Sequence, residues 1–319
     1  MKIHLITNCT SRKLHKLTSK VHLKDISKDA ISPSENWTKI LSKQVDLLPA
    51  LDAYAGDHWA KVKDIERLGA SLWIVSAGYG LISADTKICS YNATFNSNDE
   101  NSVSKFYSKE NLKEKNRCWW KDIHKGRESS IEKIYFDHPG DIFFIALPPN
   151  YLKVIEPELD NLASCGVINL HNTYIFSSKQ DLSLSLKECF YQAKEDFCEQ
   201  LGGSRVSLII RLARYIFKGL SLKEPTYPQV QKMYNALLLG SSPVKHINRR
   251  KMTDKNVIDF ILTELNDSTL TKISTTKLLK KMRDQGMGCE HKRFSKIYSE
   301  LLVEIKNTNF REVSKNGKS

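Results

Sequence analysis

Four short apolar runs stand out in the first 175 residues, at 3–7, 72–77, 142–147 and 167–170. Each has the length of a β-strand and is rich in Ile, Val, Phe or Leu, and none alternates cleanly between apolar and polar residues. Strands buried on both faces show this pattern, because helices cover both faces of a parallel sheet. The pattern therefore predicts four strands of a mostly parallel sheet.

Apolar residues at helical spacing lie between and after these runs, at 36–54, 152–162 and 205–218. Strands that alternate with helices are typical of an α/β domain with helices on both faces of the sheet. We therefore expect a three-layer α/β/α fold over residues 1–240.

The segment 96–138 is polar and charged and contains no evident strand, although it holds Trp119 and Trp120. An insertion of this length between two strands is usually a functional lid or a helical excursion. Several cations surround the two indoles: Arg117, Lys121, Lys125 and Arg127. The pair could stack on bases at a DNA interface, with Arg127 as a further contact, or it could pack the insertion onto the core.

A stretch rich in Gly, Ser and Pro interrupts the pattern at 240–248. Beyond it, apolar spacing predicts three helices, at 255–265, 274–282 and 292–305, with a glycine turn between the last two. Three short helices with such a turn predict a helix-turn-helix-like DNA-binding module over residues 249–319. The alternative is a small structural bundle whose lysine side chains are simply solvated.

The charge balance favours a polyanion as the partner. The chain has 49 Lys and Arg against 36 Asp and Glu, a net charge of +13, and residues 241–319 hold 17 of these cations but only 9 of the anions. Such an excess increases both affinity and association rate for nucleic acid. We expect DNA contacts from five cations of the C-terminal module: Lys277, Lys281, Arg283, Lys292 and Arg293.

Other classes of protein find little support in the sequence. No run approaches the ~18 apolar residues that a membrane span needs, and the N-terminal apolar run is too short for a signal peptide. The seven cysteines are scattered without CxxC spacing, which predicts neither a zinc site nor a disulfide framework. A lone Gly-Tyr-Gly at 78–80 has neither a Walker nor a GxGxxG frame, which favours a tight turn over a phosphate-binding nest. We expect a cytoplasmic protein with no membrane partner, no metal and no cofactor.

Polar and aromatic residues crowd the loops that follow the four predicted strands. In a parallel α/β sheet, ligands bind at the carboxyl ends of the strands. Asn, Ser, Thr and Tyr can hydrogen-bond to a base or sugar, and tyrosine can also stack on a ring. The candidates for base and sugar binding are Tyr79, Tyr91, Asn92, Asn150, Tyr151 and His171, and Arg12 and Lys13 are candidate DNA contacts.

Asp85 and Asn8 are the catalytic candidates. Asp85 lies beyond the second predicted strand, where a carboxylate could orient water or stabilise an oxocarbenium-like sugar. The alternative is an ordinary aspartate in a surface turn. Asn8 ends the first predicted strand and could position water or hydrogen-bond the departing base.

Two further groups of residues leave alternatives open. Cys9 lies close to Arg12 and Lys13, so it could be an activated thiol, or it could be a half-buried residue that closes a strand. Asp57 and His58 could form a polar site or could belong to the packing at a helix end.

Three segments carry a family resemblance: NCTSRK at 8–13, AYAGDHW at 53–59 and WIVSAGYGLISADTKICSYNATF at 73–95. They resemble a YaaA-related bacterial family, which is distantly similar to the uracil-DNA glycosylase superfamily and to the glycosylase-like domain of archaeosine synthase. The tail at 277–298 resembles a helical module that accompanies this domain. The Gly-Gln-Asp-Pro-Tyr and His-Pro-Ser motifs of the uracil enzymes are absent, and His138-Pro139-Gly140 precedes a predicted strand instead of following one.

The resemblance implies a uracil-DNA glycosylase-like fold and a DNA glycosylase activity on a modified base. One characterised activity in this neighbourhood is a phage-defence glycosylase that removes glucosylated hydroxymethylcytosine from viral DNA. The alternatives are a non-catalytic DNA-binding stress-response protein and a transferase that exchanges a base in nucleic acid. A nuclease is disfavoured, because the predicted loops offer no cluster of carboxylates for metal ions.

Overall fold

The computed structural model describes residues 1–14, 20–27, 32–109, 111–125, 129–178, 181–220, 226–243, 249–266 and 274–316. The chain divides into two compact units, Met1–Pro243 and Val244–Ser319. Within the described ranges, no helix combines the length and the apolar character that crossing a membrane requires.

A six-stranded sheet forms the centre of the first unit. Its strand order is β10 (Phe190–Gln192), β9 (Thr173–Ser177), β8 (Ile142–Ala146), β1 (Ile3–Asn8), β4 (Ser71–Ser76) and β5 (Gly80–Ser83). All neighbouring pairs are parallel except β4 and β5. Every residue of β8 and β9 is buried, as expected for strands that are covered on both faces. The prediction of a mostly parallel sheet is confirmed.

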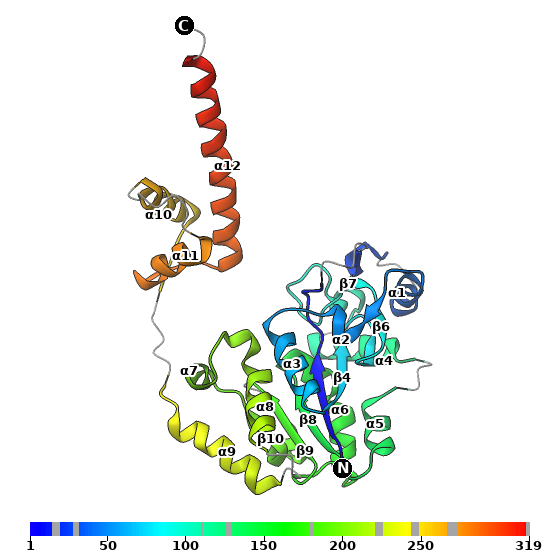
Figure 1. The fold of residues 1–319 in the computed structure, drawn as a ribbon. Coiled ribbons are helices and arrows are strands. Elements are labelled where there is room, and N and C mark those ends of the chain that lie inside the picture. The colour runs from blue at the N-terminus through cyan, green and yellow to red at the C-terminus, as the bar shows by residue number, and fades with distance from the viewer. Residues whose placement is uncertain are drawn as a thin grey trace. The chain divides into compact units, whose positions relative to one another are not determined.

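Helices cover both faces of this sheet (Figure 1). The chain passes from β1 through α3 (Asp57–Arg67) to β4, and from β8 through α6 (Pro149–Ser164) to β9. These two crossovers run in opposite directions along the sheet, and because such crossovers are right-handed, α3 and α6 lie on opposite faces. Helix α8 (Leu208–Gly219) packs on α3, whereas α4 (Leu112–Ile123) and α5 (Ile131–Asp137) pack on α6.

The remaining elements complete the described part of the first unit. The helices are α1 (Pro33–Ser42), α2 (Ala50–Ala53), α7 (Cys198–Leu201) and α9 (Tyr227–Gly240), and the 3-10 turns are Leu23–Asp25, Val103–Phe106, Leu184–Cys189, Glu195–Phe197 and Arg205–Ser207. The strand β2 (Lys20–His22) pairs in parallel with β7 (Ser90–Asn92), and β3 (Leu48–Pro49) pairs antiparallel with β6 (Lys87–Ile88).

The prediction for the fourth strand is wrong. Residues 167–172 form a turn, and the strand is β9, six residues later than predicted. The Asn172 side chain holds the turn, because its amide donates to the Val167 carbonyl at 2.8 Å and its Oδ1 accepts from the Asn169 N–H at 3.1 Å. Asparagine favours such turns, and the apolar run at 167–170 conceals them.

The structure confirms some of the predicted helices and shortens one of them. The helix expected over 36–54 is wrong beyond Ser42: α1 ends there, and Leu48, which precedes Pro49, is extended in β3 because a residue before proline avoids the helical conformation. The prediction at 152–162 lies within α6, and the prediction at 205–218 covers a short 3-10 turn and α8. The 96–138 insertion is a helical excursion that contains α4 and α5.

The second unit has its own apolar core, built from α10 (Asp254–Asn266), α11 (Thr275–Asp284) and α12 (His291–Asn316). The side chains of Val257, Leu278, Met282 and Phe294 are buried in this core. The hydroxyl of Ser274 caps α11 by accepting from the Lys277 N–H, and the glycine turn contains Gly286 at φ +80°. The strands β11 (Arg250–Lys251) and β12 (Met287–Gly288) pair in parallel. All three predicted helices are present.

Candidate functional site

The carboxyl ends of three neighbouring strands define the candidate site. Strands β1, β4 and β8 lie side by side, with Asn8 opposite Val75 and Thr7 opposite Ala146, so the strands end at about the same level. The chain after β1 meets the start of α6, where the Cys9 Sγ and the Tyr151 hydroxyl are hydrogen-bonded at 3.3 Å. The expected convergence of these two strand-end loops is therefore present. We call this side of the sheet the carboxyl edge.

His58 lies at the carboxyl edge in the first turn of α3. Its Nε2 is 3.1 Å from the Thr7 Oγ1, and the Thr7 hydroxyl donates its own hydrogen to the Ala146 carbonyl at 3.1 Å. The Thr7 oxygen must therefore accept from an Nε2–H, which leaves a lone pair on Nδ1. Burial lowers the pKa of His58 to about 4. At neutral pH this side chain is an uncharged imidazole with one assigned tautomer.

A network of hydroxyl groups fixes the turn between β4 and β5. The Tyr91 hydroxyl is 2.7 Å from the Tyr54 hydroxyl and 2.6 Å from the Ser76 Oγ, which also accepts from the Gly78 and Tyr79 N–H groups. Burial raises the pKa values of Tyr54 and Tyr91 well above the usual range, so both phenols stay protonated. A Cβ on Gly78 would stand 2.4 Å from Cε2 of the Tyr91 ring. The turn therefore requires glycine at this position.

Lys13 points inward at the same edge. Its Nζ lies 3.9 Å from the centroid of the Tyr91 ring and donates to the Thr10 carbonyl at 3.1 Å. Burial lowers the pKa of this amine to about 8. The cation–π contact holds the amine against the ring, which disfavours the DNA contact predicted for Lys13. The neighbouring Arg12, the other predicted contact in this loop, is exposed.

Cys9 is buried beneath this loop. Its side chain is 6% exposed, and its Sγ contacts the Tyr151 hydroxyl. Of the two interpretations left open by the sequence, the contact favours a residue that closes the strand over a reactive thiol, which would need to be accessible.

The predicted placement of Asp85 is wrong. The residues expected to form a loop after the second strand are β5, which runs back along β4 with Ser83 opposite Trp73. The Ala84 N–H then donates to the Leu72 carbonyl, so Asp85 lies exposed at the amino ends of the parallel strands, which we call the amino edge. Four residues of strand, about 13 Å, separate its level from that of Asn8. Gly80, at φ +72°, permits the tight turn that reverses the chain.

His171 is also misplaced by the sequence pattern. Because the fourth strand is β9, His171 precedes this strand instead of following it and lies exposed at the amino edge. It cannot share a site with Asn8 at the opposite edge of the sheet.

The DNA contacts predicted for Trp119 and Trp120 are wrong. The two side chains are 0% and 5% exposed, so the packing alternative holds. The Trp120 Nε1–H donates to the Glu158 Oε1 at 2.7 Å, and the Trp119 Nε1–H donates to the Ala77 carbonyl at 2.8 Å. Trp119 therefore supports the turn after β4 from behind. Arg127 lies outside the described residues.

Among the predicted base- and sugar-binding residues, Tyr91 and Tyr151 are buried, 0% and 7% exposed, so neither can stack on a base in this conformation. Asn92 lies 3.1 Å from the His22 ring in the pair of β2 and β7. Tyr79 and Asn150 remain partly exposed at the carboxyl edge, and the Tyr79 hydroxyl accepts from the Cys89 N–H at 3.0 Å. Tyr91 and Tyr151 instead pack beneath the surface of the carboxyl edge.

In the second unit, three of the five predicted DNA contacts have partners within the unit. The Lys281 Nζ is 2.6 Å from Glu264, the Arg293 Nε is 2.6 Å from Asp254, and Arg283 donates to the Cys289 carbonyl at 2.8 Å. Lys277 and Lys292 are exposed. Arg249 and Lys251, which are not among the predicted DNA contacts, line a cavity of about 550 Å³ together with Arg293.

One cluster has the composition of a metal site. At the amino edge, Asp141 Oδ2 lies 3.0 Å from the His4 Nε2 and 3.8 Å from the His138 Nδ1. However, the Trp73 Nε1–H donates to the His4 Nδ1 at 3.0 Å, so the neutral ring must carry its hydrogen on Nε2. That hydrogen points to Asp141 and removes the lone pair that a metal would need. The donor set therefore fits a hydrogen-bonded cluster better than a metal centre.

The sequence also contains signals for functional residues that are not among the predicted site residues. Thr7 is a polar residue within a buried strand, and such a side chain needs a partner, which is His58. Arg211, Arg214 and Lys218 are spaced by three and four residues, which places them on one face of a helix.

A scan against protein-family models finds no match to this chain. Searches of curated proteins and of solved structures find no match either.

Proposed function

We propose that this protein is a DNA glycosylase that hydrolyses the N-glycosidic bond of a modified base and leaves an abasic site. The proposal includes a uracil-DNA glycosylase-like class for the α/β/α domain and a helix-turn-helix-like, DNA-binding role for the second unit. The observation that carries it is the state of His58 in the first turn of α3. This side chain is a neutral imidazole whose tautomer is defined by its hydrogen bond to Thr7, near the end of β1. The cation excess of the chain supports DNA as the substrate.

The reaction requires water to add to C1′ of the sugar while the C1′–N bond breaks. The base departs with the bonding electron pair and gains a proton, and the water loses one. Because the transition state resembles an oxocarbenium ion, the water needs orientation more than strong activation. The Nδ1 lone pair of His58 can accept a hydrogen bond from this water. A proton acceptor with a pKa of about 4, such as this imidazole, suffices for that task.

Asn8 is the second residue that we assign to the reaction. One N–H of its amide donates to the Cys9 carbonyl at 2.8 Å, which fixes the side chain at the strand end. Its remaining N–H and its Oδ1 can then hydrogen-bond to the departing base or to the water. Tyr79 and Asn150, which are partly exposed at the same edge, are the candidates for contact with a base that has left the stack.

Asp57 adjoins His58 but has another assignment. The Ser207 hydroxyl, together with the Arg211 and Lys61 cations, lowers the pKa of this carboxylate, although burial acts in the opposite direction. Its Oδ2 is 2.5 Å from the Arg211 Nη2. We therefore assign Asp57 to the orientation of Arg211 and not to the sugar.

The identity of the base follows only from the resemblance. Glucosylated hydroxymethylcytosine in phage DNA is the first candidate, and antiphage defence is the corresponding role. A non-catalytic DNA-binding protein would share the charge pattern, and a base-exchanging transferase would share the requirement for a base-sized site. The substrate test separates these three functions.

The test incubates the full chain with plain, hydroxymethylated and glucosylated DNA, each single- and double-stranded. Mass spectrometry detects the released base, and alkaline cleavage detects abasic sites. We expect both products from a modified substrate and at least a 100-fold loss of release in His58→Gln. His171→Gln, which alters an exposed histidine at the amino edge, is the matched control and keeps the parent rate.

Two outcomes would replace the proposal. DNA binding without base release from any substrate identifies a DNA-binding protein. Incorporation of a labelled free base, with no accumulation of abasic sites, identifies a transferase.

A further inference from the structure

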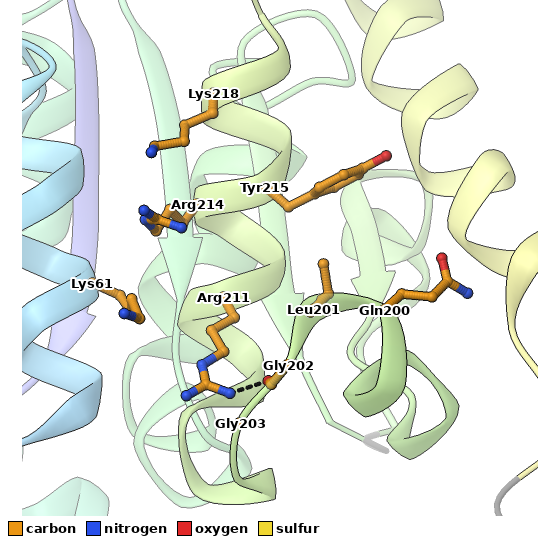
Figure 2. Close-up of a pocket in the computed structure, with 9 residues that line it drawn as sticks. All are labelled: Lys61, Gln200, Leu201, Gly202, Gly203, Arg211, Arg214, Tyr215 and Lys218. Atoms are coloured by element: carbon orange, nitrogen blue, oxygen red, sulfur yellow. Dashed lines mark hydrogen bonds between the residues drawn. The ribbon is translucent and has the colours of Figure 1, made fainter.

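A second charged feature lies on the face of the sheet that α3 and α8 cover. A cavity of about 380 Å³ is lined by Lys61 of α3, by Arg211, Arg214 and Lys218 of α8, and by Gly202 and Gly203. Figure 2 shows the three cations of α8 on the side of that helix that faces α3. We call this cavity the α3–α8 pocket.

The charges of the pocket do not cancel. Asp57 pairs with Arg211 and lies 4.0 Å from Lys61, and Asp64 lies 2.8 Å from the Arg214 Nη2. Lys218 is exposed and forms no ion pair with any residue that the structure describes. Four cations therefore face two carboxylates, and both carboxylates bond to an arginine in a way that fixes its orientation.

The arginines also keep unused hydrogen-bond donors. The Arg211 side chain is only 10% exposed, yet within the described ranges neither its Nε nor the Nε of Arg214 has an acceptor. A buried N–H without a partner costs roughly 1–3 kcal/mol. Oxygens of an anion in the pocket are suitable acceptors, because a guanidinium presents several N–H donors to one phosphate.

The loop beside the pocket is shaped around Arg211. Gly203 has φ +75°, and a Cβ at this position would overlap the Arg211 guanidinium. The guanidinium also donates to the Gly202 carbonyl, as the dashed line in Figure 2 marks. The side chain is thus held in place before any ligand binds, which reduces the entropy lost on binding.

Arg211 places one end of the pocket near the reaction site that we propose, because it contacts Asp57. The Ser207 hydroxyl, directly before α8, donates to Asp57, and Asp57 is the residue before His58. The first turns of α3 and α8 therefore meet at the carboxyl edge. An anion bound beside Arg211 would therefore lie close to this edge.

From these observations we infer that the α3–α8 pocket binds a backbone phosphate of the DNA strand whose base enters the site at His58. The inference rests on the proposed function in taking DNA as the partner and His58 as the site that the base enters. Lys61, Arg211, Arg214 and Lys218 supply the positive charge, and Asp57 and Asp64 orient the two arginines. The phosphate is held outside the reacting centre, so the pocket positions the strand and carries no sequence specificity.

The test measures DNA affinity by fluorescence anisotropy from low to moderate salt. Lys218→Gln and Arg214→Gln each remove one cation, and Lys153→Gln, on an exposed position of α6 at the opposite face, is the matched control. Each pocket variant should weaken binding uniformly across sequences and reduce the slope of log affinity against log salt by about 1. Melting curves exclude loss of fold, and Lys218→Gln removes no described ion pair.

The outcomes separate this inference from the proposed function. If the parent releases a base but the pocket variants keep the parent's slope, the phosphate site is wrong and the glycosylase proposal stands. If no substrate yields a base but the slope falls as stated, the phosphate site stands alone. A third arm adds inorganic phosphate or a mononucleotide. Binding of either one at the pocket, with DNA binding unchanged in the variants, would show a small-molecule site and overturn the assignment to a backbone phosphate.

Discussion

The two edges of the sheet each contain a histidine whose pKa burial lowers, and the two side chains are held differently. At the amino edge, both ring nitrogens of His4 have partners, because Nδ1 accepts from Trp73 and Nε2–H donates to Asp141. At the carboxyl edge, His58 uses Nε2 on Thr7, and no described residue bonds to its Nδ1. A fully satisfied polar cluster stabilises the fold, whereas a partly satisfied one can still bind a ligand.

The acidic residues of the two edges follow the same division. Asp141 accepts from the Lys2 N–H at 2.7 Å and from His4, and its bonds end within the protein. Asp57 instead holds Arg211 against a cavity. We therefore expect the amino edge to contribute stability and the carboxyl edge to bind a ligand, and single substitutions at each edge can contradict this division.

The largest expected effect is on catalysis at the carboxyl edge. His58→Gln can keep a donor for Thr7 but loses the imidazole Nδ1, so base release should fall at least 100-fold, equivalent to about 3 kcal/mol of transition-state stabilisation. Single-turnover base release measures the chemical step. His171→Gln should stay within two-fold of the parent. Equal rates of base release for the parent and His58→Gln would show that His58 does not take part in the reaction.

The second effect is the dependence of stability on pH. Below about pH 6.5 the unfolded chain protonates residue 58, whereas the folded protein does so only near pH 4. The free energy of unfolding must therefore fall as the pH drops through this window, by about 3 kcal/mol from this group. Urea unfolding at pH 7 and pH 4.5 should show a smaller decrease for His58→Gln than for the parent. His171→Gln, which alters an exposed ring, should show the parent's decrease.

Much of the fold could be predicted because it depends on local pattern. The strand at 142–147 is buried on both faces, and this burial is visible as an uninterrupted apolar run. The fourth strand was missed because an asparagine turn interrupts a run that is equally apolar. The reversal of the chain at Gly80 was missed because nothing local distinguishes a loop from an antiparallel return strand.

The site was less predictable, because it depends on which edge each loop reaches. Asn8 follows a correctly predicted strand and lies where expected, whereas Asp85 and His171 each follow an error in strand assignment. The burial of Trp119 and the bond from His58 to Thr7 depend on tertiary packing between distant segments. A single sequence does not encode such pairings in its spacing.

The third prediction tests the amino edge. Asp141→Asn removes the charge that accepts from Lys2 and His4, and it introduces an amide donor toward groups that are themselves donors. We expect a loss of about 1–3 kcal/mol in the free energy of unfolding, measured in urea, and no loss of base release per folded molecule. Asp137→Asn is the control, because among the described residues this carboxylate forms an ion pair with Lys133 alone, at the surface, and should contribute about 0.5 kcal/mol or less. A selective loss of activity in Asp141→Asn would place function at the amino edge.

The smallest expected effect belongs to Asp85, the carboxylate that the sequence pattern places in the reaction site. The structure places it exposed in the turn after β5, about 13 Å in strand level from Asn8. At that separation, in solvent and within physiological salt, its charge is largely screened from a sugar at the carboxyl edge. Asp85→Asn should therefore leave base release within two-fold of the parent and the free energy of unfolding within about 0.5 kcal/mol. The same single-turnover assay and urea series measure both quantities. A ten-fold loss of release in Asp85→Asn, with the fold intact, would mean that the reaction takes place at the amino edge and that the division of roles between the two edges is reversed.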